Sequence, residues 1–148
     1  MKRAIKEAIK TPVSEIPVGC IITCNNEIIA SCHNRKEEIK DVTAHAEILA
    51  IRDAQTKLNR WRLDDCTMYV TLEPCPMCAW AILQSRIKTL YFGAYNSQCG
   101  AFGSVIDLKK VANSSIKIYA GIEEEKCDNI LEDFFKRLRN DNNKEWIR

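Results

Sequence analysis

The stretch Tyr69-Val-Thr-Leu-Glu-Pro-Cys-Pro-Met-Cys-Ala79 joins a β-prone run to a pair of cysteines in C-x-x-C spacing. Its first part, ending at Leu72, is rich in β-branched and aromatic residues and predicts a strand. Pro76 suits the first position of a helix, because proline lacks the backbone N–H that is unpaired there in any case. The stretch therefore predicts a strand-to-helix turn with Cys75 and Cys78 at the start of the helix.

A second fragment, His45-Ala46-Glu47, lies upstream at the start of another predicted helix, for which we expect Thr43 to be the N-cap. Either motif alone is weak evidence. Both together, with a proline directly before the first cysteine, are expected by chance roughly 0.002 times in a chain of this composition. The N-terminal ends of helices favour thiolates over thiols. The two fragments together indicate a metal site.

One histidine and two cysteines supply three ligands, the number typical of a catalytic zinc site with an open fourth position for water. Glu47 is the candidate carboxylate to move protons beside that water. Residues i and i+2 do not share a helix face, so His45 and Glu47 converge only if the helix presents its first turn end-on. The alternatives are a core histidine, a redox C-x-x-C pair and a carboxylate that merely favours the helix start.

The rest of the chain predicts an α/β protein with helices at both ends. A helix over 2–10 precedes a hairpin whose turn is Asn25-Asn26, and Glu123 begins a closing helix with acids first and bases last. The other predicted elements are strands over 18–23, 27–31, 67–72, 89–92 and 116–119, a helix after Thr43, and a helix over 76–86. This order predicts one mixed sheet with helices on both faces.

Length and composition describe one globular domain, 1–148, with 46% hydrophobic and 28% charged residues. An apolar run of the length that a membrane span needs is lacking, so we expect no membrane partner. The charged start, Met1-Lys-Arg-Ala-Ile-Lys-Glu7, lacks the apolar run of a secretory signal, and we expect a cytoplasmic protein.

Eight cysteines in a reducing compartment argue for metal binding, catalysis or burial rather than disulfides. Two of them belong to the C-x-x-C pair. We expect the other six to be buried core thiols: Cys20, Cys24, Cys32, Cys66, Cys99 and Cys127.

The formal net charge of +2 does not by itself indicate a nucleic-acid binder. Residues 134–148, however, hold five bases against two acids, a local charge of +3. Phe134 and Phe135 cannot both face the core from adjacent helical positions, so one is available for binding or for packing against a neighbouring element. This stretch is suited to phosphate contacts with aromatic stacking, although a solvated helix end has the same composition.

At these motifs the chain resembles the zinc-dependent nucleobase deaminases of the cytidine deaminase-like superfamily, and most closely the bacterial tRNA-specific adenosine deaminases. The resemblance implies a three-layer α/β/α fold with a central mixed five-stranded sheet. It extends over nearly the whole chain, through Glu15-Ile-Pro-Val-Gly19, His33-Asn-Arg35, Thr43-Ala-His-Ala-Glu-Ile48, Tyr69 to Ala79, Ser85-Arg-Ile87, Tyr91-Phe-Gly-Ala94, Gly103-Ser104 and Asp133-Phe-Phe135.

The resemblance implies one zinc ion per subunit, bound by His45, Cys75 and Cys78, with Glu47 as the general acid/base. It also implies the substrate-binding residues: Asn34 and Val18 in the purine pocket, with Ala46, Phe135 and Asn96 as further contacts. From the residues alone, Asn34 also fits turn chemistry and Val18 a strand core. Asn96 stands where the bacterial members usually carry an aspartate.

The implied reaction converts the wobble adenosine, anticodon position 34, to inosine in the anticodon stem-loop of a tRNA, and the family works as a homodimer. One alternative is a free nucleobase deaminase acting on guanine or cytosine, since Pro76 also occurs in relatives of that kind. A non-catalytic, zinc-stabilised RNA-binding or partner subunit is the other. The intact Glu47 counts against this last reading, because inactive members commonly lose that glutamate.

Overall fold

The computed structural model describes residues 1–140 as five strands and six helices arranged around one sheet. The strands are β1 (Gly19–Cys24), β2 (Glu27–His33), β3 (Cys66–Leu72), β4 (Thr89–Ala94) and β5 (Lys117–Tyr119). The helices are α1 (Lys2–Ile9), α2 (Lys36–Ile39), α3 (Ala46–Leu58), α4 (Pro76–Gln84), α5 (Leu108–Val111) and α6 (Glu124–Asn140).

The sheet is mixed, with the strand order β2-β1-β3-β4-β5. Strand β1 is antiparallel to both β2 and β3, whereas β3, β4 and β5 run parallel. The hairpin turn lies at Asn25 and Asn26, both with positive φ, as predicted. The expected mixed five-stranded sheet is therefore confirmed.

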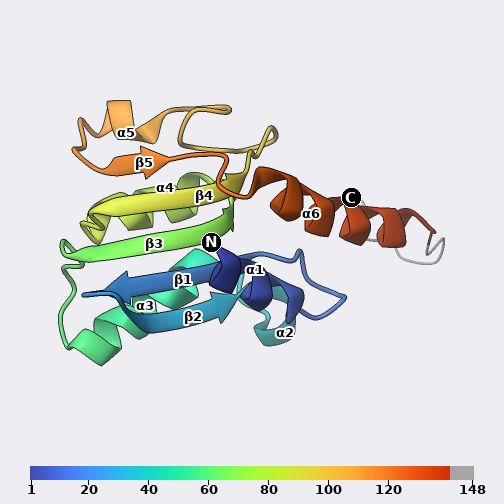
Figure 1. The fold of residues 1–148 in the computed structure, drawn as a ribbon, viewed down its shortest axis with the longest axis horizontal. Helices are drawn as coiled ribbons and strands as arrows, with labels where there is room; N and C mark the ends of the chain where they lie inside the picture. Colours follow the sequence, from blue (N-terminus) through green and yellow to red (C-terminus); the bar gives the residue numbers. More distant parts are fainter. Residues whose placement is uncertain (141–148) are drawn as a thin grey trace.

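Helices cover both faces of the sheet, as Figure 1 shows: α3 and α4 lie behind it, and α1 lies on the opposite face. Helix α6 begins beside β4 and extends beyond the end of the sheet. On the α3 side, Ala50 and Ala54 pack with Ile82 of α4 against Met68 and Phe92 in one buried core. Small alanines let α3 lie close to the strands. The three-layer α/β/α architecture expected from the resemblance is confirmed.

Two glycines let α1 and α6 approach the sheet closely. A Cβ at Gly19 would lie 2.1 Å from the carbonyl oxygen of Ala4 in α1, and one at Gly93 would lie 2.3 Å from Cys127 Sγ in α6. Neither distance is possible for real atoms, so both positions require the hydrogen of glycine. The packing of α1 and α6 thus depends on single residues in β1 and β4.

The predicted N-cap at Thr43 is wrong, because α3 begins at Ala46 and its N-cap is His45. Thr43 instead donates from its backbone N and its hydroxyl to Asp41 Oδ1, at 2.8 and 2.7 Å. Because the Thr43 hydroxyl is hydrogen-bonded within this local turn, it does not cap the helix. The two four-residue helices α2 and α5 were not predicted.

All eight cysteines are free thiols, in agreement with the expected absence of a disulfide framework. Four of the six expected core thiols are buried, namely Cys20, Cys24, Cys66 and Cys127. Cys32 is only half-buried and Cys99 is exposed, so the prediction is wrong for Cys99, which lies in the loop after β4. Within residues 1–140, none of the helices has the length and apolarity to cross a membrane.

Candidate active site

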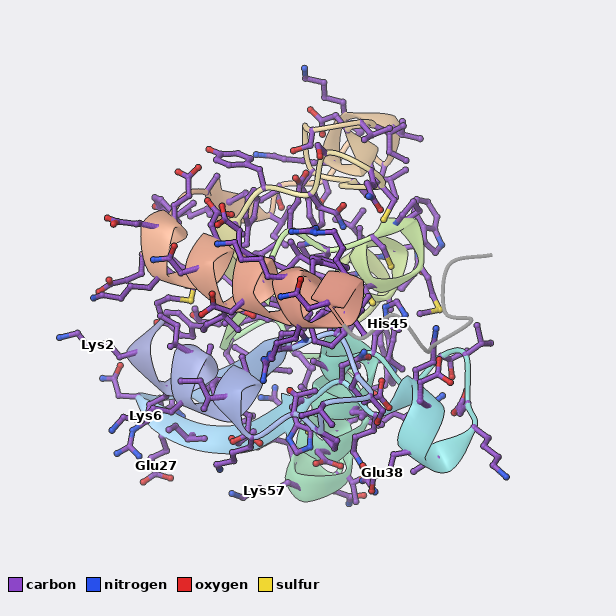
Figure 2. All side chains as sticks on the ribbon, turned by 90° about the vertical axis from the view of Figure 1, so that its right-hand side faces the viewer. Lys2, Lys6, Glu27, Glu38, His45 and Lys57 are labelled. Atoms are coloured by element: carbon purple, nitrogen blue, oxygen red, sulfur yellow. The ribbon has the colours of Figure 1, made fainter. Side chains whose placement is uncertain are left out.

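The starts of α3 and α4 bring His45, Cys75 and Cys78 together. His45 and Cys75 are the N-caps of the two helices, and Cys78 lies in the first turn of α4 behind Pro76. His45 Nδ1 is 3.6 Å from Cys75 Sγ and 3.5 Å from Cys78 Sγ. Figure 2 labels His45 at the end of the molecule where these helices begin. The three side chains predicted as ligands thus form one cluster.

The two thiols are electrostatically distinct. The hydrogen bond with Cys78 lowers the pKa of the Cys75 thiol to about 4, helped by the bond with His45. The same contact, together with burial, raises the pKa of Cys78. The contact with Cys75 also raises the pKa of His45. Cys75 is therefore held as a thiolate, the form that binds metals.

Glu47 lies in the first turn of α3 with only 5% of its surface exposed. Burial raises the pKa of its carboxyl to about 7, and its side chain shares a hydrogen bond with Cys78. His45 has an extended backbone, φ −71° and ψ 151°, so helix periodicity does not separate it from Glu47. Glu47 thus lies in the first turn of the helix whose N-cap is His45.

The chemistry of the donor set fits zinc. One nitrogen and two sulfur ligand atoms all lie within 4.8 Å of one another, and zinc prefers these donors. A second group with this spacing, Cys24, Asp65 and Cys66, fits a cation less well. The guanidinium of Arg60 pairs with Asp65 and lies 3.9 Å from Cys24 Sγ, so a positive charge already occupies its surroundings.

Asn34 and Val18, predicted to line the purine pocket, are neighbours in the structure. The backbone N of Asn34 donates to the carbonyl oxygen of Val18 at 3.1 Å, and each residue is 8% exposed. The next backbone N, of Arg35, donates to Ala44 beside His45, also at 3.1 Å. The segment that carries Asn34 is thereby tied to the segment that carries His45.

The other three residues that were predicted to contact the substrate lie in three different surroundings. Ala46 is fully buried, and its methyl group packs in the core under α3. Asn96 lies after β4, where its side-chain oxygen accepts from the backbone N of Gln98 and Cys99. Phe135 is 40% exposed on α6, a helix that packs on β4 and α1.

The ring of Phe135 packs edge-on against buried Phe134, with ring centroids 5.3 Å apart. One of the two adjacent aromatic residues thus faces the core and the other does not, as predicted. The second half of the basic stretch, 141–148, lies outside the described residues.

Two buried carboxylates organise the loops around the site and were missed by sequence reasoning. Glu15 binds Asn34 and the start of α2, and Glu73 accepts hydrogen bonds from Asn96, Phe102 and Ser104. The available signal was an acidic residue within an otherwise apolar run, in Glu15-Ile-Pro-Val and in Thr71-Leu-Glu-Pro. Such residues are seldom buried without partners.

A family model described as MafB19-like deaminase matches residues 1–139. The sheet order, the two covering helix layers and the His45, Cys75 and Cys78 cluster agree with that match. Together they define a deaminase of the cytidine deaminase-like fold.

Similar proteins identify the family within this class of deaminases. A tRNA-specific adenosine deaminase of Bacillus subtilis is 43% identical over 142 residues, which cover 94% of this chain and 88% of the relative. A solved structure from work on A-to-I editing by tRNA:A34 deaminases is 39% identical with a TM-score of 0.85, covering 88% of this chain and 97% of that one. The chain belongs to the family of tRNA-specific adenosine deaminases.

A guanine deaminase of Bacillus subtilis is also similar, at 32% identity and a TM-score of 0.62. The match covers 97% of this chain and 94% of that one. The same fold therefore carries a deaminase named for a free base, and the choice of substrate depends on residues around the shared centre.

Proposed function

We propose that this chain hydrolyses the wobble adenosine of a tRNA anticodon to inosine and releases ammonia. The observation that carries the deaminase chemistry is the buried Glu47 carboxyl in contact with Cys78 of the ligand cluster. Support for the tRNA substrate comes from the relatives, which are named for it and match nearly the whole chain.

His45, Cys75 and Cys78 would hold one zinc ion per chain. Zinc, when bound there, lowers the pKa of a water molecule enough to make it a nucleophile near neutral pH. The Cys75 thiolate is the donor best prepared for it. The position of the three ligands at two helix starts fixes them on rigid elements rather than on free loops.

Glu47 moves the protons. Water adds to C6 of the adenine, and Glu47 transfers the proton of that water to the adjacent ring nitrogen. A second proton transfer converts the exocyclic amino group into ammonia, which leaves as the C6 carbonyl forms. The reaction consumes one water and needs no net proton from Glu47. The low exposure of Glu47 keeps bulk water away from this exchange.

Asn34 and Val18 would contact the purine, and Phe135 and Asn96 would contact the surrounding RNA. Support for the first pair is its link through Arg35 and Ala44 to His45. On α6 the described basic residues Lys136, Arg137 and Arg139 accompany Phe135, a combination suited to phosphates and bases.

We further propose a single domain, 1–148, that acts as a homodimer in the cytosol, where mature tRNA is found. Large apolar side chains are exposed on segments near the site, which supports association. They include Ile39 and Val42 before α3, Trp80 on α4, and Val105 and Ile106 before α5.

The deciding experiment incubates purified, zinc-loaded protein with an anticodon stem-loop RNA that carries adenosine at the wobble position. Parallel reactions contain free guanine, free cytosine or free adenine. We expect inosine in the RNA, ammonia in equal amount and no turnover of the free bases. A stem-loop with guanosine at the wobble position serves as the control.

Two other results would each assign a different function to this chain. Turnover of guanine or cytosine without RNA would replace the proposal with a free nucleobase deaminase. RNA binding without turnover, by protein that retains zinc, would indicate a non-catalytic partner subunit.

A further inference from the structure

Glu15 is a carboxylate buried to 1% exposure in the segment before β1, and the mechanism above does not use it. Its two oxygens have separate partners. Oε1 accepts from the backbone N of Glu37 at 2.6 Å and of Glu38 at 2.9 Å. Oε2 accepts from the side-chain Nδ2 of Asn34 at 3.2 Å.

The Oε1 contacts form a cap. Helix α2 has only four residues and its own N-cap, Arg35, makes no side-chain capping bond. The first backbone N–H groups of a helix lack partners within it, and Glu15 supplies one from a distant segment. This contact holds α2 against the segment that leads into β1.

The Oε2 contact fixes an orientation. A carboxylate oxygen accepts but does not donate, so the NH2 end of the Asn34 amide must face Glu15. The carbonyl oxygen and the second N–H of Asn34 then have defined directions. Because Asn34 is 8% exposed and its backbone is held by Val18, the amide has little other freedom.

We propose that Glu15 is a positioning residue that sets which hydrogen-bonding groups Asn34 presents to the substrate base. This inference rests on the proposed function, in which Asn34 contacts the purine. A purine edge alternates acceptors and donors, so a reversed amide would oppose like groups. Glu15 thereby acts on base recognition without touching the base.

Glu15→Gln separates the two roles of the carboxylate. The amide oxygen of glutamine keeps the acceptor toward Glu37 and Glu38, so the α2 cap is retained. Its NH2 group then faces Asn34 in place of Oε2, and two NH2 groups oppose each other. Asn34 must turn its amide over, which exchanges its donor and acceptor.

We expect Glu15→Gln to lower kcat/KM on the stem-loop by about 10-fold to 100-fold, with zinc content and melting temperature close to wild type. Combined with Asn34→Ala, the Glu15→Gln change should have no further effect, because no amide remains to be positioned. Glu27→Gln, on the exposed start of β2 and well apart from His45 in Figure 2, is the matched control.

An equal loss in the Asn34→Ala background, or wild-type kinetics for Glu15→Gln, would overturn the inference. So would a melting temperature as low as that of Glu15→Ala, since that result would mean that the cap is the only role. The side-chain NMR amide signal of Asn34, assigned by its absence in Asn34→Ala, should shift in Glu15→Gln without any substrate. An inactive wild-type protein would count against the proposed function, whereas an unmoved amide signal would count against the role of Glu15.

Discussion

Glu47 and His45 lie two positions apart in the chain, yet we predict that their removal has different consequences. Glu47→Ala should lower the rate of inosine formation by at least about 100-fold, because the proton carrier is lost. Its zinc content should stay near one ion per chain. His45→Ala should lose both activity and zinc, since one of three ligands is gone.

Metal analysis of the purified proteins, alongside the rate on the stem-loop, checks this pair of variants. The exposed Glu27→Gln should match wild type in both measurements. A Glu47→Ala enzyme that works at a near-normal rate would contradict the assigned role.

From the contacts of the Glu7 carboxyl we predict how the free energy of unfolding depends on pH. Burial alone would raise the pKa of its carboxyl, but bonds with Lys10, His33 and Ser31, at 2.8, 3.0 and 3.0 Å, outweigh burial and hold the pKa below its usual value. A carboxyl whose pKa is lowered by folding stabilises the protein above its unfolded-state pKa. That stabilisation is lost as the pH falls through the folded-state pKa.

Glu7→Gln should therefore lower the free energy of unfolding by about 1 to 2 kcal/mol at pH 7. The difference from wild type should shrink as the pH falls below the ordinary pKa of a glutamate, about 4.3, and through the lower pKa of the folded state, where the wild-type carboxyl also becomes protonated. Urea unfolding over a pH series measures both values. A difference that stays constant down to pH 3 would show that charge is not its cause.

At the scale of elements, the sequence was sufficient where an element has enough residues to show a period. The hairpin, the strand before Glu73 and the helix that Pro76 begins were all predicted within a few residues. Helix α2 and helix α5 have four residues each, too few for a pattern. The N-cap was misplaced because Thr43 has a competing local partner in Asp41, which a sequence pattern does not reveal.

The residues of the candidate site also fall into those that the sequence predicts and those that it does not. His45, Cys75 and Cys78 were predictable because ligand chemistry restricts both residue type and spacing. Glu15 and Glu73 were not, since their partners come from segments 19 to 31 positions away in the chain. Such contacts exist only once the sheet has assembled.

Glu73 links the end of β3 to the loop over 96–104. Its Oε1 accepts from the backbone N of Phe102 and Ser104, and its Oε2 accepts from the backbone N of Asn96 and the hydroxyl of Ser104. In Glu73→Gln an NH2 group would oppose one of these donors. We expect a loss of about 2 kcal/mol in the free energy of unfolding.

Hydrogen exchange of the backbone amides of Asn96, Phe102 and Ser104 should report that change directly, with faster exchange in Glu73→Gln. Ser104→Ala removes a single donor and should have a smaller effect on the same amides. Unchanged protection in Glu73→Gln would rule out the anchoring role.

Gly93 controls how closely α6 lies on β4. An added methyl group would meet Cys127 Sγ at 2.3 Å and the Thr71 carbonyl oxygen at 2.8 Å, so Gly93→Ala should destabilise the protein by about 1 to 3 kcal/mol. Cys127→Ala in the same chain should recover only part of this, because the contact with Thr71 remains. Thermal unfolding of wild type, Gly93→Ala and the double variant tests the order, and a Gly93→Ala protein as stable as wild type would contradict it.

At the scale of the whole molecule, the surface around the start of α4 is more apolar than one isolated chain requires. Trp80 is 45% exposed only two positions after Cys78, and Val105 is 52% exposed before α5, which packs on α4. Apolar side chains gathered near a site favour a partner surface there. In the proposed homodimer, α4 would lie at the interface, so that the second subunit borders each site.

Sedimentation at micromolar concentration should therefore give a mass twice the 16.9 kDa of one chain. Trp80→Glu should shift the protein toward single chains, because a carboxylate buried at an interface has no partner. Trp61→Glu is the matched control, since Trp61 is 58% exposed beyond the opposite end of α3 and already stacks with Arg62. If Trp80→Glu sediments like wild type, the subunits associate through another surface; if wild type sediments as a single chain, the site is complete within one subunit.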